Sequence, residues 1–237
     1  MHNNARAHQA KDAHSVLAVG AHPDDIELGC GGALLMHKAA GDRVTMLIMT
    51  DGTRGPGDTY ELAATRRAEQ EEASRLLGAE VRWGGFRDGT LSHDIVSISS
   101  IERTMHDVGA DIVYVHYPDD SHQDHRAAAR STLSAARHIG HVLHYQSPST
   151  LESFTPYVFV DINGFLDKKV AAIAKHASQV GLSSMVDLDW VQAAARYWGG
   201  RARVPYAEAF SPARMLFDIV GRRRAGPEPR FQPPAGN

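Results

Sequence analysis

The fold is decided by the stretch SVLAVGAHPDDIELGCGGALLMHKAAGDRVTMLIMT, residues 15–50. It opens with the apolar run SVLAVGAH (15–22) and closes with a similar run, RVTMLIMT (43–50). Between them, GALLMHKAAG (32–41) has helical composition and ends at a glycine. Short apolar runs bounded by turns are typical of strands buried on both faces, and glycine commonly follows the last residue of a helix. The stretch therefore predicts a strand–helix–strand unit of a parallel sheet.

The same alternation continues toward the C-terminus. Further strands are expected at 80–85, 111–117 and 141–146, and helices at 61–78, 95–109 and 125–140. After residue 147 the alternation loosens, with a strand expected at 156–162 and helices at 165–180 and 186–199. We predict an α/β fold with a Rossmann-like, mainly parallel sheet, helices on both faces and a small C-terminal elaboration. A single domain is expected over 14–220, with flexible tails at 1–13 and 221–237.

Composition excludes several classes of protein. Of 237 residues, 43% are apolar and 22% are charged, as in ordinary globular proteins. The formal net charge of −3 provides no general basic field, so nucleic acid is a poor candidate partner. The single cysteine, Cys30, excludes an internal disulfide and suits a reducing compartment. No stretch approaches the ~20 apolar residues of a spanning helix, and the N-terminus lacks a secretory signal, so we expect a cytoplasmic protein without a membrane span.

Polar side chains follow the first predicted strand directly. His22, Asp24 and Asp25 stand where that strand ends, and ligands of open α/β sheets gather at this edge. Burying imidazole and carboxylate groups is costly unless something pairs with them, and both are normal zinc ligands. Pro23 restricts the backbone, which favours a turn where one aspartate binds a metal and the other faces its bound water. The alternative is that these are only turn and helix-capping residues.

The glycines after this turn raise a second alternative, binding of a dinucleotide phosphate. The motif G-x-G-x-x-G would need glycine where Leu34 stands, and the two aspartates put negative charge where a phosphate would sit. Nucleotide binding is therefore the weaker interpretation. Cys30, among these glycines, is expected to be a small packed residue.

A second polar cluster, DDSHQDH (119–125), follows the fourth predicted strand. Adjacent strands lie ~5 Å apart, so the two clusters could share one ion. His22 and Asp25 with one histidine of this cluster would make a three-ligand site. The alternative is a surface loop with a helix cap. His116, inside the apolar strand, is expected to be a core residue.

Together these motifs resemble the LmbE-like family, also called the PIG-L deacetylase family. Its pattern is A-H-P-D-D with a glycine-rich turn, then H-x-D-H about a hundred residues later. This sequence has AHPDDIELGCGG at 21–32 and HQDH at 122–125. Further matching segments are TDGT at 50–53, RRAEQEEASRLLG at 66–78, FRDGTL at 86–91, KHASQ at 175–179 and YAEAF at 206–210.

The resemblance implies a zinc-dependent N-deacetylase. The expected reaction is hydrolysis of the N-acetyl group of an N-acetylglucosamine-type amino sugar or glycoconjugate by metal-activated water. One Zn²⁺ per chain is implied, and His22, Asp25 and His125 resemble its ligands. Iron or cobalt could also occupy such a site.

The remaining roles are also implied by the resemblance. Asp24 resembles the general base. His122 resembles the group that stabilises the oxyanion or protonates the leaving amine, and Asp124 resembles a carboxylate that orients a histidine or tunes the base. Arg66 and Asp88 stand where the family contacts the sugar.

The sequence departs from the family pattern at three positions. Gln123 replaces the proline of H-P-D-H, so the turn is less constrained. Asp120 stands near the position where some members have tyrosine, so no tyrosine is carried over into the oxyanion pocket. Thr53 replaces the glutamate of T-x-G-E.

Two alternatives to this function remain open. A metal-dependent amidase acting on a thiol conjugate or another amide would use the same site. A non-catalytic sugar- or nucleotide-binding Rossmann module would need a degenerate site, which the intact Asp24 argues against. The identity of the sugar and assembly into a homo-oligomer are also left open.

Overall fold

The computed structural model describes residues 13–54, 60–181 and 186–216. In chain order its elements are β1 (Ser15–Gly20), α1 (Asp25–Ala39), β2 (Arg43–Thr50), α2 (Tyr60–Leu77), β3 (Glu80–Phe86), α3 (Ile95–Val108), β4 (Ile112–His116), α4 (Gln123–Ala135), β5 (His141–Tyr145), β6 (Val158–Asp161), α5 (Leu166–Ile173), α6 (Leu188–Ala202) and β7 (Ala207–Met215). The strands form one sheet in the order β3-β2-β1-β4-β5-β7-β6. β1 to β5 are parallel, and β7 runs antiparallel to both its neighbours. The predicted α/β fold with a mainly parallel sheet is confirmed.

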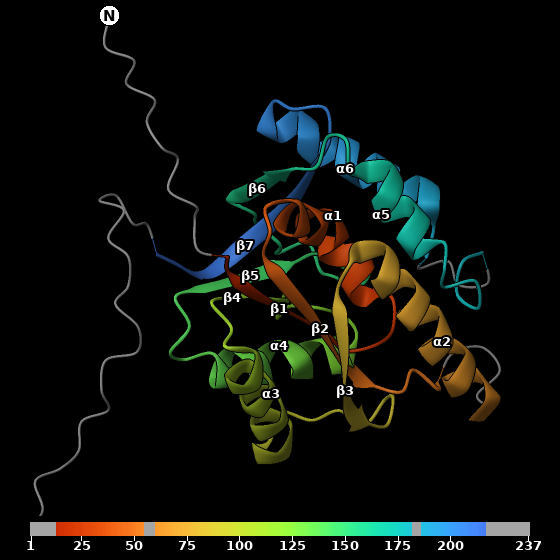
Figure 1. The fold of residues 1–237 in the computed structure, drawn as a ribbon, viewed down its shortest axis with the longest axis vertical. Coiled ribbons are helices and arrows are strands. Elements are labelled where there is room, and N and C mark those ends of the chain that lie inside the picture. The colour runs from red at the N-terminus through yellow and green to blue at the C-terminus, as the bar shows by residue number, and fades with distance from the viewer. Residues whose placement is uncertain (1–12, 55–59, 182–185, 217–237) are drawn as a thin grey trace, which may run out of the picture.

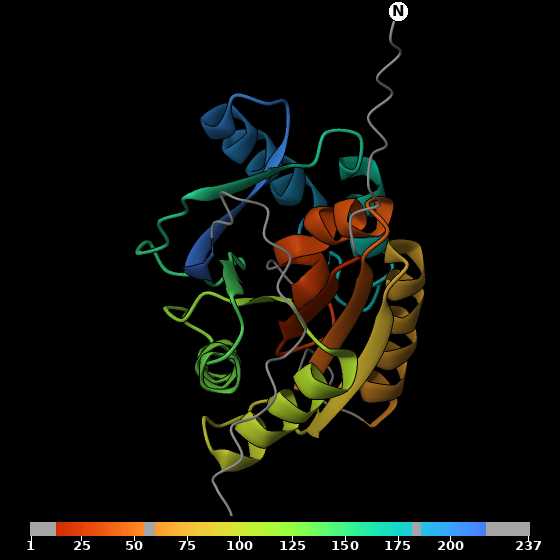
Figure 2. The same ribbon diagram turned by 60° about the vertical axis from the view of Figure 1, so that its left-hand side comes forward.

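Helices cover both faces of this sheet (Figures 1 and 2). Helices α1 and α2 lie on one face with α5 packed against them, and α3 and α4 lie on the other. Alternate residues of β1 separate accordingly: Val16 and Ala18 belong to the core under α1 and α2, while Leu17 and Val19 belong to the core under α3 and α4. Because the central strands are buried on both faces, they read as continuous apolar runs.

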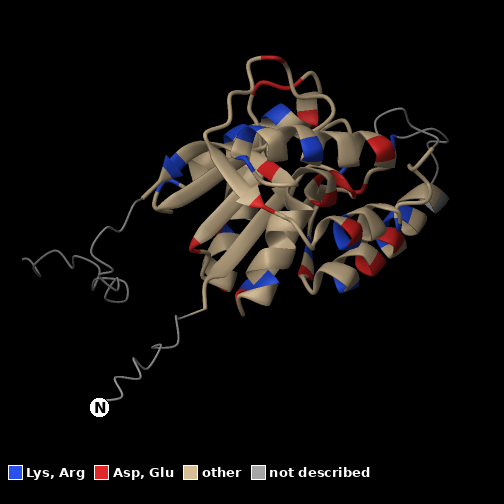
Figure 3. Ribbon diagram, turned by 90° about the horizontal axis from the view of Figure 1, so that it is seen from above, with Lys and Arg blue, Asp and Glu red and all other residues tan. Residues whose placement is uncertain are grey.

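Figure 3 shows acidic and basic segments interspersed along the outer helices. On α2, for example, exposed Arg67 pairs with Glu71 at 3.4 Å. In the described parts of the chain, no helix has the length and apolar character needed to cross a bilayer.

The pairing of β1 with β4 positions the functional edge of the sheet. β1 lies between β2 and β4. The strands that directly follow β1 in the chain, β2 and β3, extend the sheet on one side, and β4 and β5 extend it on the other. Such a switch point opens a crevice beyond the carboxyl ends of the two strands. Both polar clusters singled out in the sequence start at this crevice.

Helix α1 begins earlier than predicted, at Asp25 rather than residue 32. The glycine-rich segment is helical on both sides of a break at Cys30, whose φ of −145° and ψ of 15° interrupt the helix. Cys30 itself is fully buried, as expected for a small packed residue. Burial raises the pKa of its thiol well above the ordinary value.

A buried ion pair from the C-terminal part of the chain makes hydrogen bonds to backbone groups on both sides of the break in α1. The Glu208 carboxylate on β7 accepts the N–H groups of Gly32 at 2.8 Å and Ala33 at 2.7 Å. The Lys169 ammonium on α5 contacts Glu208 at 2.6 Å and donates to the Leu28 carbonyl at 2.8 Å. Lys169 and Glu208 are each only 4% exposed, so neither charge has ready access to water.

Other limits also differ from the sequence prediction. The helix expected over 125–140 ends at Ala135, and the helix expected over 165–180 ends at Ile173. Strand β7 is not among the predicted strands, because AEAFSPARM has no continuous apolar run and becomes a strand by pairing with β5 and β6. The predicted tails fall almost entirely outside the described residues, at 1–12 and 221–237.

Replacing Lys169 with methionine should destabilise the fold by about 3–5 kcal/mol, because Glu208 would remain buried without its cation. Urea denaturation followed by circular dichroism measures the loss. The double variant Lys169→Met, Glu208→Gln should recover part of it, since a neutral amide oxygen can still accept one N–H of α1. Wild-type stability in Lys169→Met would show that the pair does not stabilise the break.

Candidate metal centre and active site

The predicted site residues converge from several strand ends. His22 follows β1, Asp24 and Asp25 begin α1, and His122 and His125 begin α4 after β4. All five line one cavity of about 440 Å³. The cavity wall also includes Arg66 from α2, Asp88 from the loop after β3, and further residues Leu28, Arg54, Gly89, Gln123, Pro148, Ser149, Gln179 and Val186. The remaining predicted residue, Asp124, is fully buried behind His22.

Ligand atoms of His22, Asp25 and His125 lie close together. His22 Nδ1 lies 3.3 Å from His125 Nε2. Asp25 contacts both nitrogens, with Oδ2 3.3 Å from His22 Nδ1 and Oδ1 3.3 Å from His125 Nε2. Ligand atoms that are 2.0–2.1 Å from a tetrahedral zinc ion lie about 3.3–3.4 Å from one another. The side chains of His22, Asp25 and His125 therefore fit one face of such a site.

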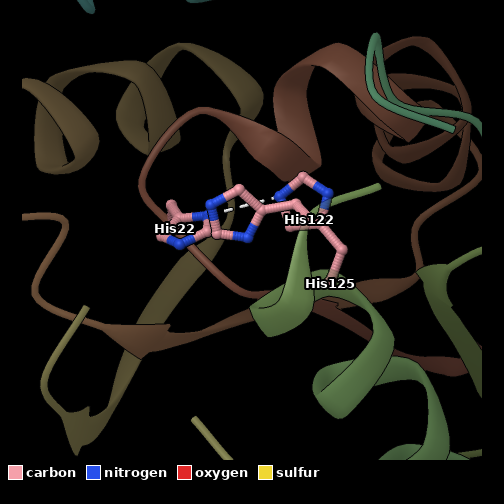
Figure 4. A group of neighbouring side chains, drawn as sticks. All are labelled: His22, His122 and His125. Atoms are coloured by element: carbon pink, nitrogen blue, oxygen red, sulfur yellow. Dashed lines mark hydrogen bonds between the residues drawn. The ribbon is translucent and has the colours of Figure 1, made fainter. Parts of the chain in front are cut away.

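His122 lies close to the same group of side chains. Figure 4 shows its imidazole beside those of His22 and His125, with centroid separations of 4.6 and 4.7 Å. One nitrogen from each of these three histidines could also hold an ion. His122 Nδ1, however, accepts the N–H of Asp124 at 3.2 Å, so a neutral ring carries its proton on Nε2. Burial, followed by the nearby His22 and His125, lowers the pKa of His122, which favours this neutral form.

Two carboxylates orient the outer nitrogen of His22. Nε2 lies 3.3 Å from Asp124 and 3.2 Å from Asp88. Asp124 also accepts the N–H of Gly89 at 2.7 Å, so its position is fixed from the loop after β3. Burial lowers the pKa of His22, but the hydrogen bonds to Asp124, Asp25 and Asp88 outweigh burial and raise it well above its ordinary value. A carboxylate that holds Nε2–H leaves Nδ1 free to bind a metal.

His125 has the equivalent arrangement on its outer nitrogen, formed by residues that the sequence did not reveal. Its Nδ1 lies 3.2 Å from the Asp120 carboxylate and 3.1 Å from the Ser149 hydroxyl. The sequence marks Asp120 only as a departure from the family pattern, and Ser149 lies in the irregular segment after β5. Their role has no signal in the sequence because it depends on β5 lying beside β4.

Asp24 is held in a strained conformation at the start of α1. Its φ of 96° is in the left-handed region, which costs a residue other than glycine about 1–3 kcal/mol. Gln70 accepts its N–H at 3.1 Å, and Arg66 contacts its carboxylate at 3.1 Å. Burial raises the pKa of Asp24 to about 6, although the Arg66 cation opposes this rise. The carboxyl group is therefore tuned close to neutral pH.

Arg66 also makes hydrogen bonds to two loops, the one after β1 and the one after β2. Its guanidinium donates to the carbonyl of Pro23 at 2.7 Å and to that of Gly52 at 2.9 Å. These hydrogen bonds hold Arg66 to the backbone beside Asp24, where it forms part of the cavity wall.

His116 is a core residue, as predicted, and it also supports the site. It is fully buried and stacks on His125 with a centroid separation of 4.0 Å. Its Nε2 lies 3.1 Å from both the Asp25 carboxylate and the N–H of Ala21. Burial, followed by the charge of His125, lowers the pKa of His116 to about 4, so the ring is neutral near pH 7.

The family-like segments 66–78 and 175–179 meet behind the site. Glu69 on α2 accepts the N–H of Ser178 at 2.8 Å and its hydroxyl at 2.7 Å. His176 is fully buried, with Nε2 3.7 Å from the Glu27 carboxylate. Gln70 donates to Glu27 at 2.6 Å, which links this layer to Asp24.

Comparison with known proteins identifies the family of the chain. The family model described as GlcNAc-PI de-N-acetylase, PIG-L, matches residues 17–136. The uncharacterized deacetylase YaiS of Escherichia coli (strain K12) is 33% identical over 184 residues, covering 74% of this chain and 97% of that protein.

Two solved structures are similar over most of the chain. The conserved protein TT1542 from Thermus thermophilus has a TM-score of 0.76 and 31% identity, covering 88% of this chain and 99% of that one. The N,N'-diacetylchitobiose deacetylase from Pyrococcus horikoshii has a TM-score of 0.75 and 27% identity, covering 85% of this chain and 84% of that one. The chain belongs to the PIG-L deacetylase family.

Proposed function

We propose that the protein is a zinc-dependent hydrolase that removes the N-acetyl group from an N-acetylglucosamine-type amino sugar or glycoconjugate. The observation that carries the proposal is the cluster of His22, Asp25 and His125 in the cavity that also holds Asp24. His22 Nδ1 and His125 Nε2 lie 3.3 Å from one another, and each lies 3.3 Å from a different oxygen of Asp25. Family membership and the similarity to a diacetylchitobiose deacetylase support the choice of an acetylated amino sugar. The cavity volume of about 440 Å³ lies in the range of small-molecule sites.

We propose that His22, Asp25 and His125 hold one zinc ion per chain. When bound, zinc supplies Lewis-acid activation of a water molecule and polarisation of the acetyl carbonyl. All three side chains are nearly buried, at 7%, 5% and 6% exposed, which shields the ligands from bulk water. Binding must displace the protons that the apo site holds on its histidines, so metal affinity should fall as the pH is lowered.

Asp24 is the proposed general base. It lines the cavity with the three ligands, and its carboxylate can accept a proton from water. Attack by the water on the acetyl carbon requires one proton to leave the water, and Asp24 accepts it. The same proton then passes to the departing nitrogen as the C–N bond breaks, which yields the free amine and acetic acid; the acid then loses its remaining proton to water and leaves as acetate.

His122 is the proposed donor to the oxyanion. Because Nδ1 accepts the Asp124 N–H, the neutral ring presents Nε2–H as its free donor. A donor placed at a developing oxyanion contributes about 3–4 kcal/mol in known enzymes. Arg66 and Asp88, in the wall of the same cavity, are the proposed contacts to the sugar.

Metal content is the first test. Wild-type protein supplied with zinc should carry close to one ion per chain by elemental mass spectrometry, and His125→Ala should lose it because one of the three proposed ligands is removed. His106→Ala, on the exposed end of α3, is the matched control and should keep the metal. Little metal in both wild type and variant would reject the hydrolase proposal and favour a binding module.

Turnover measurements distinguish the proposed general base, Asp24, from the proposed metal ligands. Asp24→Asn should keep zinc but lose about 10²–10⁴-fold in kcat on diacetylchitobiose, because the amide cannot accept the proton of water. A parallel assay with simple N-acetyl amides and thiol conjugates distinguishes a sugar deacetylase from a broader amidase. Undiminished turnover by Asp24→Asn would remove Asp24 from the base role.

The tuning of Asp24 by Arg66 can be measured without any substrate. In metal-free protein, carbon-13 NMR titration should give the Asp24 carboxyl a pKa near 6. Arg66→Met should raise this pKa further, because the cation that favours the carboxylate is gone while burial remains. Arg67→Met, an exposed neighbour stacked over Trp83, should leave it unchanged. A pKa that stays level or falls in Arg66→Met would contradict the assigned role.

A further inference from the structure

Asp120 is a heavily hydrogen-bonded carboxylate beside the candidate metal site. It lies in the loop between β4 and α4 and is 1% exposed. Its Oδ1 accepts the N–H of His122 at 2.8 Å. Its Oδ2 accepts the hydroxyls of Ser147 at 2.7 Å and Thr150 at 3.1 Å, and lies 3.2 Å from His125 Nδ1. An isolated β-bridge to Thr150 fixes the backbone of the loop as well.

These bonds determine which nitrogen of His125 can face the ion. An ionised carboxylate only accepts hydrogen bonds, so Nδ1 beside Asp120 must carry a proton. The lone pair of the neutral ring is then on Nε2, the atom that lies 3.3 Å from both His22 Nδ1 and Asp25. Three other donors, the His122 N–H and the hydroxyls of Ser147 and Thr150, point at the Asp120 carboxylate and stabilise its ionised form.

The Ser149 hydroxyl is the competing acceptor, at 3.1 Å from His125 Nδ1. A hydroxyl is a weaker acceptor than a carboxylate, because charge-assisted hydrogen bonds are about twice as strong as neutral ones. The Ser147 hydroxyl lies farther from Nδ1, at 3.4 Å, and donates its own hydrogen to Asp120. The charged oxygen of Asp120 is therefore the favoured partner.

We propose that Asp120 is a positioning residue that fixes the tautomer and orientation of His125 and thereby sets the affinity of the site for its metal ion. The inference rests on the proposed metal site and adds a residue to it. Each histidine ligand then has its own buried carboxylate, Asp124 for His22 and Asp120 for His125. Segment 120–125 supplies one ligand and both of these carboxylates.

The test is the zinc dissociation constant, measured by competition with a chromophoric chelator. Asp120→Asn keeps the shape but turns one oxygen into an NH₂ donor, so either the His122 N–H or the His125 Nδ1–H would face another donor. Zinc affinity should fall by about 10–100-fold, the usual effect of removing such an orienting partner. Asp119→Asn, an exposed carboxylate one position earlier that contacts Ser153, is the matched control and should bind zinc as wild type does.

Ser149→Ala separates the two possible acceptors, and its zinc affinity should stay within a few-fold of wild type. Unchanged affinity in Asp120→Asn, or a large loss in Ser149→Ala alone, would overturn the inference. If wild type itself bound no zinc, the proposed function would fail instead, so the two failures are distinguishable.

A measurement on wild type covers the case in which Asp120→Asn does not fold. Long-range ¹H–¹⁵N spectra of the zinc-loaded protein report which ring nitrogen of each histidine carries a proton. We expect Nδ1–H in His125 and Nε2–H in His22. Ligation of His125 through Nδ1 would leave Asp120 no proton to accept, and the inference would be wrong.

Discussion

The parallel pairing of β1 with β4 is the constraint on which the site depends. Their register, with Val19 opposite Val115, ends both strands at the same edge. His22 and His125 are 103 positions apart in the chain, yet this pairing places their ring nitrogens 3.3 Å apart. The sheet is buried on both faces, so a slip of register would cost apolar burial as well as the site. The stability of the core thus fixes the geometry of the ligand atoms.

Gathering the polar side chains of the site in a buried cavity lowers the stability of the folded protein. Asp24 is held at a positive φ, and carboxylates and imidazoles that prefer water lie buried together. Reciprocal hydrogen bonds offset much of this cost, since Asp124, Asp88 and Asp120 each face a histidine nitrogen. Proteins tolerate local strain of this kind where the surrounding structure determines the conformation. Gln70 and Arg66 provide that support for Asp24 from α2.

Helix α1 links the site to the C-terminal elaboration. The break at Cys30 would leave N–H groups of Gly32 and Ala33 unpaired in the interior, and Glu208 accepts both. Lys169 in turn binds the carbonyl of Leu28, a residue of the cavity wall. Strand β7 and helix α5 therefore act on the site through the helix that begins with Asp25, although neither supplies a metal ligand candidate.

The sequence by itself determined the parallel sheet, the helices between its strands and the two polar clusters. These features are local, because continuous apolar runs report strands buried on both faces, and HPDD and HQDH stand just after such runs. Only the tertiary structure decided that β7 joins the sheet, that Arg66 contacts Asp24, and that Asp120 faces His125. Those contacts depend on which elements lie side by side and on side-chain direction, and neither is recorded in the spacing of residues along a single chain.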